Sequence, residues 1–233
     1  MRKMMITRAA FALAALALAA PAAAQRQAPP APMPARPLQF PAFRETTLPN
    51  GLRLIVVENH AHPVASVNLL VGSGSSSVPP QHVGLAGLFA ELLPKGTATR
   101  SGAELSGAIE RTGGRIGAGS AEDYINVYAS VLSENLPLAM ELVADVTMNP
   151  SFPQDEVTAA RDRALSQLQQ WMADPGYLSN RRFTERLYGS HPYGRYRTPE
   201  TLRALDRDAM VAFHRAHFTP GNALLVVAGD SPA

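Results

Sequence analysis

Apolar and polar residues first follow a regular pattern after residue 43, in two short segments that a turn separates. The segments run from Glu45 to Leu48 and from Leu52 to Glu58, and the Pro49-Asn50-Gly51 sequence between them is typical of a hairpin. Val64 to Val71 is a further apolar run of strand length, and Gly72 to Ser77 has the composition of a flexible loop. This part of the chain therefore predicts strands that pair in a sheet.

The rest of the chain is dominated by helical spacing. Ser101-Gly102-Ala103-Glu104 fits a capping box, and Gly113-Gly114 stops the helix that it opens. Further helices are expected at Ser133–Thr147, from Pro153 onward, at Arg181–Tyr188 and at Asp206–His217, and strands at Asp123–Leu132 and, as a short buried one, at Leu224–Ala228. The predicted fold class is α+β, with a mostly antiparallel sheet covered by helices.

Length and composition limit the classes of function. The chain has 233 residues, of which 46% are hydrophobic, so it can form a substantial core and has room for one large domain or two small ones. Its formal net charge is only +2, and no basic tract interleaved with aromatic residues appears, which argues against a nucleic-acid partner. There is no cysteine, so neither a disulfide framework nor lipid attachment to a cysteine is available.

The first 24 residues are typical of a secretory signal peptide. Arg2, Lys3 and Arg8 form a positive start, Ala9 to Ala20 is apolar, and Ala22-Ala23-Ala24 supplies a cleavage site. The alternative is a membrane anchor, but an apolar run of roughly 12 residues is short of the about 20 that a span needs. We therefore expect a cleaved signal at residues 1–24, a Pro/Ala-rich linker at 25–42, a folded module at 43–233, no membrane in the mature form, and a periplasmic or secreted location.

The most informative stretch runs from Gly84 to Thr97 and reads G-L-A-G-L-F-A-E-L-L-P-K-G-T. It resembles the H-x-x-E-H helix of the inverted zincins, the family of pitrilysin, insulinase and the mitochondrial processing peptidases, where the block reads G-L-A-H-F-L-E-H-M-L-F-K-G-T. Aligned without a gap, Gly87 falls on the first histidine ligand, Ala90 on the catalytic glutamate and Glu91 on the second histidine. The resemblance thus implies the family's fold but not its chemistry.

The third zinc ligand of the family is a glutamate on a later helix, in a pattern like E-R-x-x-V-x-x-E. Ala160 to Leu168 fills that pattern here, so Gln167 takes the ligand position and Ala160 the upstream acidic one. Glycine and alanine offer no donor, and an amide carbonyl is a poor zinc ligand. We therefore predict no metal and no catalytic base at the four motif positions (Gly87, Ala90, Glu91 and Gln167), although active family members use zinc. Glu91, a charge on an apolar helix, is expected to have a partner or to face a cavity.

Other segments resemble the family in the family's own order. They are Thr47–Leu52, Gly113-Gly114, Phe152-Pro153, His191–Arg195 and Phe218–Ala223. Family members usually carry two such modules in tandem, and this chain is expected to be the N-terminal one. In the family the strand after the double glycine pairs with extended peptide and carries an Asn-Ala step. Gly117-Ala118 takes that step, so Gly117, Ala118 and Gly119 are the predicted peptide-binding edge.

The remaining candidate residues have simpler interpretations. His214 and His217 are three residues apart and could share a metal, but no third ligand is apparent and an amphipathic helix is the commoner reason for such a pair. Trp171 is interpreted as a core anchor. No G-x-S-x-G nucleophile turn and no phosphate-binding loop is present.

The resemblance implies an exported, non-catalytic zinc-peptidase homologue that is inactive alone. Its expected partners are peptide substrate and an active H-x-x-E-H homologue, with which it would form a hetero-oligomer. Two alternatives remain open. The chain could be a metalloendopeptidase with a residual or non-standard metal site, or a stand-alone peptide-binding scaffold.

Overall fold

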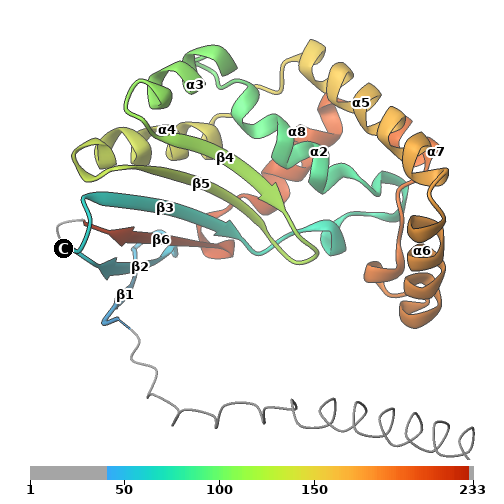
Figure 1. The fold of residues 1–233 in the computed structure, drawn as a ribbon, viewed down its shortest axis with the longest axis horizontal. Helices are drawn as coiled ribbons and strands as arrows, with labels where there is room; N and C mark the ends of the chain where they lie inside the picture. The colour runs from blue at the N-terminus through green and yellow to red at the C-terminus, as the bar shows by residue number, and fades with distance from the viewer. Residues whose placement is uncertain (1–40, 231–233) are drawn as a thin grey trace, which may run out of the picture. The chain divides into compact units, whose positions relative to one another are not determined.

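A six-stranded sheet organises the computed structural model, which describes residues 41–230 (Figure 1). The predicted signal peptide and nearly all of the predicted linker lie outside the described residues. The strands are β1 (Arg44–Thr47), β2 (Arg53–Glu58), β3 (Val64–Val71), β4 (Arg115–Ser120), β5 (Ile125–Leu132) and β6 (Ala223–Gly229). They lie in the order β1-β2-β6-β3-β5-β4.

The pairing of the strands confirms a mostly antiparallel sheet. β1 and β2 form the predicted hairpin, and β3 pairs antiparallel with both β5 and β6. β4 pairs antiparallel with β5, so only β2 and β6 run parallel. Because β6 lies between β2 and β3, the last strand of the described chain joins the N-terminal hairpin to the rest of the sheet.

The helices gather on one side of this sheet. They are α2 (Leu85–Leu92), α3 (Gly102–Glu110), α4 (Leu136–Met148), α5 (Gln154–Met172), α6 (Pro175–Tyr188), α7 (Pro199–Arg203) and α8 (Arg207–His217). Figure 1 shows α2, α3, α4 and α8 on one face, with α5, α6 and α7 grouped at one side of the molecule. The helices contact mainly β3, β4 and β5. No helix within residues 41–230 is long and apolar enough to cross a bilayer.

Alternation along the central strands shows which face is the core. On β3 and β5 every second side chain is buried, and the residues between them are half-buried and mostly polar. The buried set is Ala65, Val67, Leu69, Val71, Ile125, Val127, Ala129 and Val131. The period of two therefore turns one face toward the helices and leaves the other face uncovered by them.

The structure differs from the sequence prediction in three elements. α6 begins at Pro175 rather than at Arg181, because the Asp174 carboxylate caps the helix by accepting a hydrogen bond from the Tyr177 amide at 2.8 Å. α7 is a short helix that the apolar pattern did not predict, and a capping box at Thr198 opens it. β6 is not the buried strand that we expected: only Val227 is buried, because the helices lie over β3, β4 and β5 instead.

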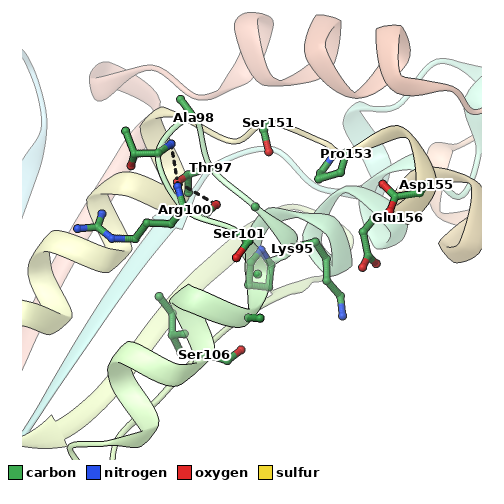
Figure 2. Close-up of a pocket in the computed structure, with 16 residues that line it drawn as sticks. Lys95, Thr97, Ala98, Arg100, Ser101, Ser106, Ser151, Pro153, Asp155 and Glu156 are labelled. Carbon is green, nitrogen blue, oxygen red and sulfur yellow. Dashed lines mark hydrogen bonds between the residues drawn. The ribbon is translucent and has the colours of Figure 1, made fainter.

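A buried carboxylate ties α4 to the loop that follows α2. Asp145 on α4 is 8% exposed and accepts hydrogen bonds from the Thr97 hydroxyl at 2.9 Å and the Arg100 guanidinium at 2.8 Å. The Asn149 amide donates to the same carboxylate at 3.2 Å. Figure 2 shows the Thr97 hydroxyl bonded to the backbone of Arg100, with an N–O distance of 3.0 Å. Burial alone would raise the pKa of the Asp145 carboxyl, but these hydrogen bonds outweigh it and hold that pKa below its ordinary value.

Replacing this carboxylate should cost stability in a pH-dependent way. We expect Asp145→Asn to lower the free energy of unfolding at pH 7 by about 2–3 kcal/mol, because buried donors lose a charged acceptor. A carboxyl with a depressed pKa stabilises the fold above its unfolded-state pKa of about 4 and loses that contribution as the pH falls through its folded-state pKa. Urea denaturation should therefore show the gap between wild type and variant narrowing below about pH 4.

The matched control is Asp162→Asn, since the Asp162 side chain is 66% exposed on α5 and its ion pair with Arg161 is long, at 4.0 Å. It should change the free energy of unfolding by less than about 0.5 kcal/mol at any pH. Equal effects of the two substitutions would contradict the assigned role of Asp145.

Candidate functional site

The orientation of α2 about its axis is set by an aromatic cluster. Phe89 is fully buried, and its ring centroid lies 5.3 Å from that of Phe152, 5.1 Å from that of Phe213 and 4.9 Å from that of Phe218. Leu85, Leu88 and Leu92 are buried with it. Side chains three or four residues apart share a helix face, so this packing turns the opposite face of α2 outward.

The two histidine positions lie on the outward face, and the base position does not. Gly87 and Glu91 are exposed and four residues apart, whereas Ala90 is 2% exposed within the core. A Cβ added at Gly87 would have only the Ser120 hydroxyl within 4 Å, at 3.9 Å, so there is room for a side chain there. The outward face of α2 therefore has a glycine where the first ligand of the family would stand.

Glu91, the only acidic residue among the four motif positions, forms an ion pair with an arginine. The Arg163 guanidinium on α5 donates to the Glu91 carboxylate at 2.7 Å. This ion pair confirms the expectation that Glu91 has a partner. The two side chains are 54% and 43% exposed, so the pair is solvated and contributes little to stability. Its consequence is chemical, because it places a positive charge next to the second ligand position.

A second arginine contacts the third ligand position. The Arg197 guanidinium donates to the Gln167 side-chain carbonyl at 3.3 Å and lies over the Trp171 ring, 4.3 Å from its centroid. Burial lowers the pKa of this guanidinium from its ordinary value. Trp171 is half-exposed rather than a core anchor, and its ring also packs against Tyr177 at 5.5 Å. The prediction that Trp171 anchors the core was wrong, because apolar composition does not show which surfaces the rest of the fold will cover.

These residues do not fit a zinc ion. Gly87 offers no donor, and the oxygens of Glu91 and Gln167 each accept from a guanidinium. Within residues 41–230 no three His, Cys, Asp or Glu side chains come together as a metal-binding group. Tetrahedral zinc needs three or four such donors, and two nearby guanidinium groups would repel it. Metal content itself remains a prediction.

The two histidines of α8 have separate partners. The His214 Nε2 atom lies 2.7 Å from the Thr147 carbonyl oxygen, and the His217 Nδ1 atom lies 2.9 Å from the Ser73 hydroxyl. Burial lowers the pKa of the His217 imidazole. The contacts favour the interpretation of this pair as part of an amphipathic helix.

The predicted peptide-binding residues lie on a free strand edge. β4 pairs with β5 on one side and with no strand of residues 41–230 on the other. Gly117 and Gly119 lie opposite Tyr128 and Asn126 on the face away from the helices, and Ala118 points toward the core. A Cβ at Gly117 would lie 2.8 Å from the Tyr128 hydroxyl oxygen, so this glycine also makes room for the tyrosine ring.

A cavity among the described residues lies elsewhere. It has a volume of about 810 Å³ and is lined by Lys95, Thr97, Ser101 and Ser106 around the loop after α2, and by Asp155 and Glu156 at the start of α5 (Figure 2). None of the four motif positions lines it. Because its polar groups do not converge on one point in Figure 2, we assign the site to the outward face of α2 and the adjoining face of α5.

Sequence reasoning missed Arg163 and Arg197. Arg163 precedes Gln167 by four residues, so helical spacing places both on one face of α5, and that signal could have found it. Arg197 follows a loop far along the chain, and no local pattern connects it with Gln167 or Trp171. Only the tertiary fold brings this guanidinium to the site.

Comparison with known proteins gives a consistent result. The model of the family described as Insulinase (Peptidase family M16) matches residues 53–197. An uncharacterized zinc protease of Mycobacterium tuberculosis is 34% identical over 203 residues, which are 86% of this chain and 46% of that protein. A probable mitochondrial-processing peptidase subunit beta of Arabidopsis thaliana is 28% identical over 82% of this chain and 36% of its own length. The chain thus spans less than half the length of these relatives.

Solved structures share the fold. The peptidase M16 inactive domain from Pseudomonas fluorescens matches with a TM-score of 0.76 and 24% identity, covering 81% of this chain and 46% of that one. A protease from Helicobacter pylori gives the same TM-score and identity, covering 83% of this chain and 48% of its own. At this identity the likeness concerns architecture alone.

The burial of Ala90 predicts which motif position tolerates change. Ala90→Glu should lower the free energy of unfolding by about 3 kcal/mol or more, because it places a carboxylate in the core without a partner. Gly87→His, on the exposed face with room for a side chain, should change it by less than about 1 kcal/mol. Urea denaturation of both variants checks this, and a destabilised Gly87→His beside a stable Ala90→Glu would show that the orientation of α2 is wrong.

Proposed function

Because the chain belongs to the insulinase family, peptidase family M16, we propose that it is an exported, non-catalytic member that binds peptides and acts as the partner of an active, zinc-bearing homologue. One observation carries this proposal. At the motif positions a glycine leaves a gap, and the two polar side chains each bind a guanidinium group instead of being free for a metal. Hydrolysis of a peptide by the family's mechanism needs a Lewis acid and a base, and the side chains at these four positions supply neither.

Peptide binding is supported by the free edge of β4. An unpaired strand edge presents backbone N–H and C=O groups that an extended peptide can bind by strand addition. Backbone pairing does not need the missing zinc ligands, so it can persist in a chain that has lost them. The glycines on β4 also leave the strand with few side-chain obstacles at this edge.

The partner role is supported by what the site lacks. A chain that binds peptide without cleaving it gains a role in proteolysis only if the reactive centre comes from another module. The relatives are more than twice as long as the matched region, which leaves space in them for further modules. The Pseudomonas fluorescens structure is itself described as an inactive domain of a peptidase.

One observation favours the alternative of a metallopeptidase with a non-standard site. Relatives that are 34% identical to the chain are called zinc proteases, although uncharacterized ones. Zinc bound at a one-to-one ratio with peptide cleavage by the isolated chain would support this alternative. A stand-alone scaffold would bind peptide without changing the activity of any homologue.

Zinc content and assisted cleavage test the proposal together. The purified chain should hold zinc far below one ion per molecule and should not cleave a peptide library. Added to an H-x-x-E-H homologue encoded in the same genome, it should raise that enzyme's rate of cleavage. The ligand substitutions Gly87→His, Glu91→His and Gln167→Glu, combined, serve as a positive control for metal uptake. Stoichiometric zinc in the wild-type chain would overturn the non-catalytic role.

Strand addition is tested with modified peptides, because replacing Gly117 would disturb Tyr128. Two versions of one bound peptide carry N-methyl groups on alternate residues, in opposite phase. In a paired strand, alternate amides face the neighbouring strand, so one version should lose at least about tenfold in affinity and the other should bind nearly as before. Equal affinity of both versions, measured by fluorescence anisotropy, would argue against the β4 edge.

A further inference from the structure

Two glycines and a glutamate follow one another along α2 at helical spacing, between two arginines. They are Gly84, Gly87 and Glu91, and Gly84 caps the helix with a φ of 107°. Gly84 is half-buried, and a Cβ there would lie 2.9 Å from a methyl group of Leu202 and 3.5 Å from the Arg197 Cβ atom. At the other end, Glu91 contacts Arg163. We call the surface made by Gly84, Gly87, Gln167 and Arg197 the glycine stripe.

One arginine beside the glycine stripe has no acidic partner in the described part of the chain. Arg163 forms an ion pair with Glu91 at 2.7 Å, and Arg161 forms one with Asp162 at 4.0 Å. Arg197 is half-buried, yet no carboxylate among residues 41–230 lies within ion-pair distance of it, and its contacts are the neutral Gln167 amide and the Trp171 ring. A half-buried guanidinium without a counter-ion is electrostatically unsatisfied, and an anion that reaches it gains a charge-assisted hydrogen bond.

The contacts of Arg197 leave part of its guanidinium for a ligand. Its central carbon lies 4.3 Å from the Trp171 ring centroid, and only the Nη2 amino group contacts Gln167. A guanidinium can bind a carboxylate through two parallel hydrogen bonds. The position of Gly87 faces Ser120, the last residue of β4. A peptide that pairs parallel with β4 would have its C-terminal end beyond Ser120, on the side where Gly87 leaves room, and in that direction a terminal carboxylate is favoured over a side chain in mid-peptide.

From these observations we propose that the glycine stripe binds the C-terminal carboxylate of a peptide through Arg197. The proposal rests on the proposed function, because it assumes a peptide on β4. Arg197 supplies the charge, Gln167 and Trp171 hold its guanidinium in place, and the absence of a side chain at Gly87 leaves room for the last peptide residue. The site thus selects chains that end at this point and performs no chemistry on them.

Two peptides of identical sequence test this, one ending in a free carboxylate and the other in a carboxamide. Wild-type protein should bind the free acid about tenfold more tightly in a fluorescence anisotropy titration, which is the effect expected for one charge-assisted contact. Arg197→Gln should bring the affinity for the acid down to that for the amide. The matched control Arg182→Gln should leave the tenfold difference intact, because Arg182 is 84% exposed on α6 and pairs with Glu185.

A second variant keeps the charge and removes the space. Gly87→Leu should weaken binding of the free acid at least fivefold, about 1 kcal/mol by the usual conversion, while Arg197 stays in place. Gly87 lies on an exposed helix face, so we expect the Gly87→Leu variant to fold. It therefore keeps the proposal testable if Arg197→Gln proves unstable.

The outcomes separate the two proposals. The wild type could bind the free acid and the amide equally while one of the two N-methylated peptides still binds at least tenfold more weakly. That result would overturn the carboxylate site and leave strand addition standing. An amidated peptide with an aspartate near its end that binds as tightly as the free acid would also overturn it, in favour of an acidic side chain. If neither peptide binds, the proposed function fails and the carboxylate site fails with it.

Discussion

The site depends on how Phe89 packs. Three other aromatic rings surround it within about 5 Å, and together they leave α2 one orientation between the sheet and α5. In that orientation Gly87 and Glu91 face outward and Ala90 faces the core. The helix that aligns with the family's motif is thus a packed element, with a glycine on its outward face and an alanine in the core at two of the aligned positions. The positions that align with the two histidines lie on a different face of this short helix from Phe89, whereas the position that aligns with the base, Ala90, is part of the core.

Two fixed positive charges stand beside the helix that aligns with the family's motif. Arg163 and Arg197 come from separate segments and meet the α2–α5 surface at Glu91 and Gln167. Under the proposed function, these guanidinium groups would attract the electron-rich parts of a peptide without a metal. A guanidinium group differs from a metal ion in reactivity. Held by an aromatic ring and an amide, it can orient a ligand but cannot activate water.

Local patterns predicted most of the fold and only part of the site. The β1–β2 hairpin, the capping box at Ser101 and the alternation along β3 follow from near neighbours in sequence, and all appear in the structure. Trp171 and β6 were assigned to the interior because apolar composition cannot tell which surfaces the helices will cover. Arg197 had no sequence signal, since its role arises only when a segment 30 residues away from Gln167 folds back onto α5. Tertiary placement, rather than local propensity, decides these positions.

The central place of β6 has a consequence for how the protein is made. Among the strands of residues 41–230, the β1–β2 hairpin is synthesised first and has no sheet neighbour other than β6, which is synthesised about 165 residues later. Until then its edge remains open while helices and the β3–β5–β4 part can already assemble. Such late, long-distance closure slows folding and exposes strand edges to other chains. Chaperones that shield nascent segments would be most useful during this interval.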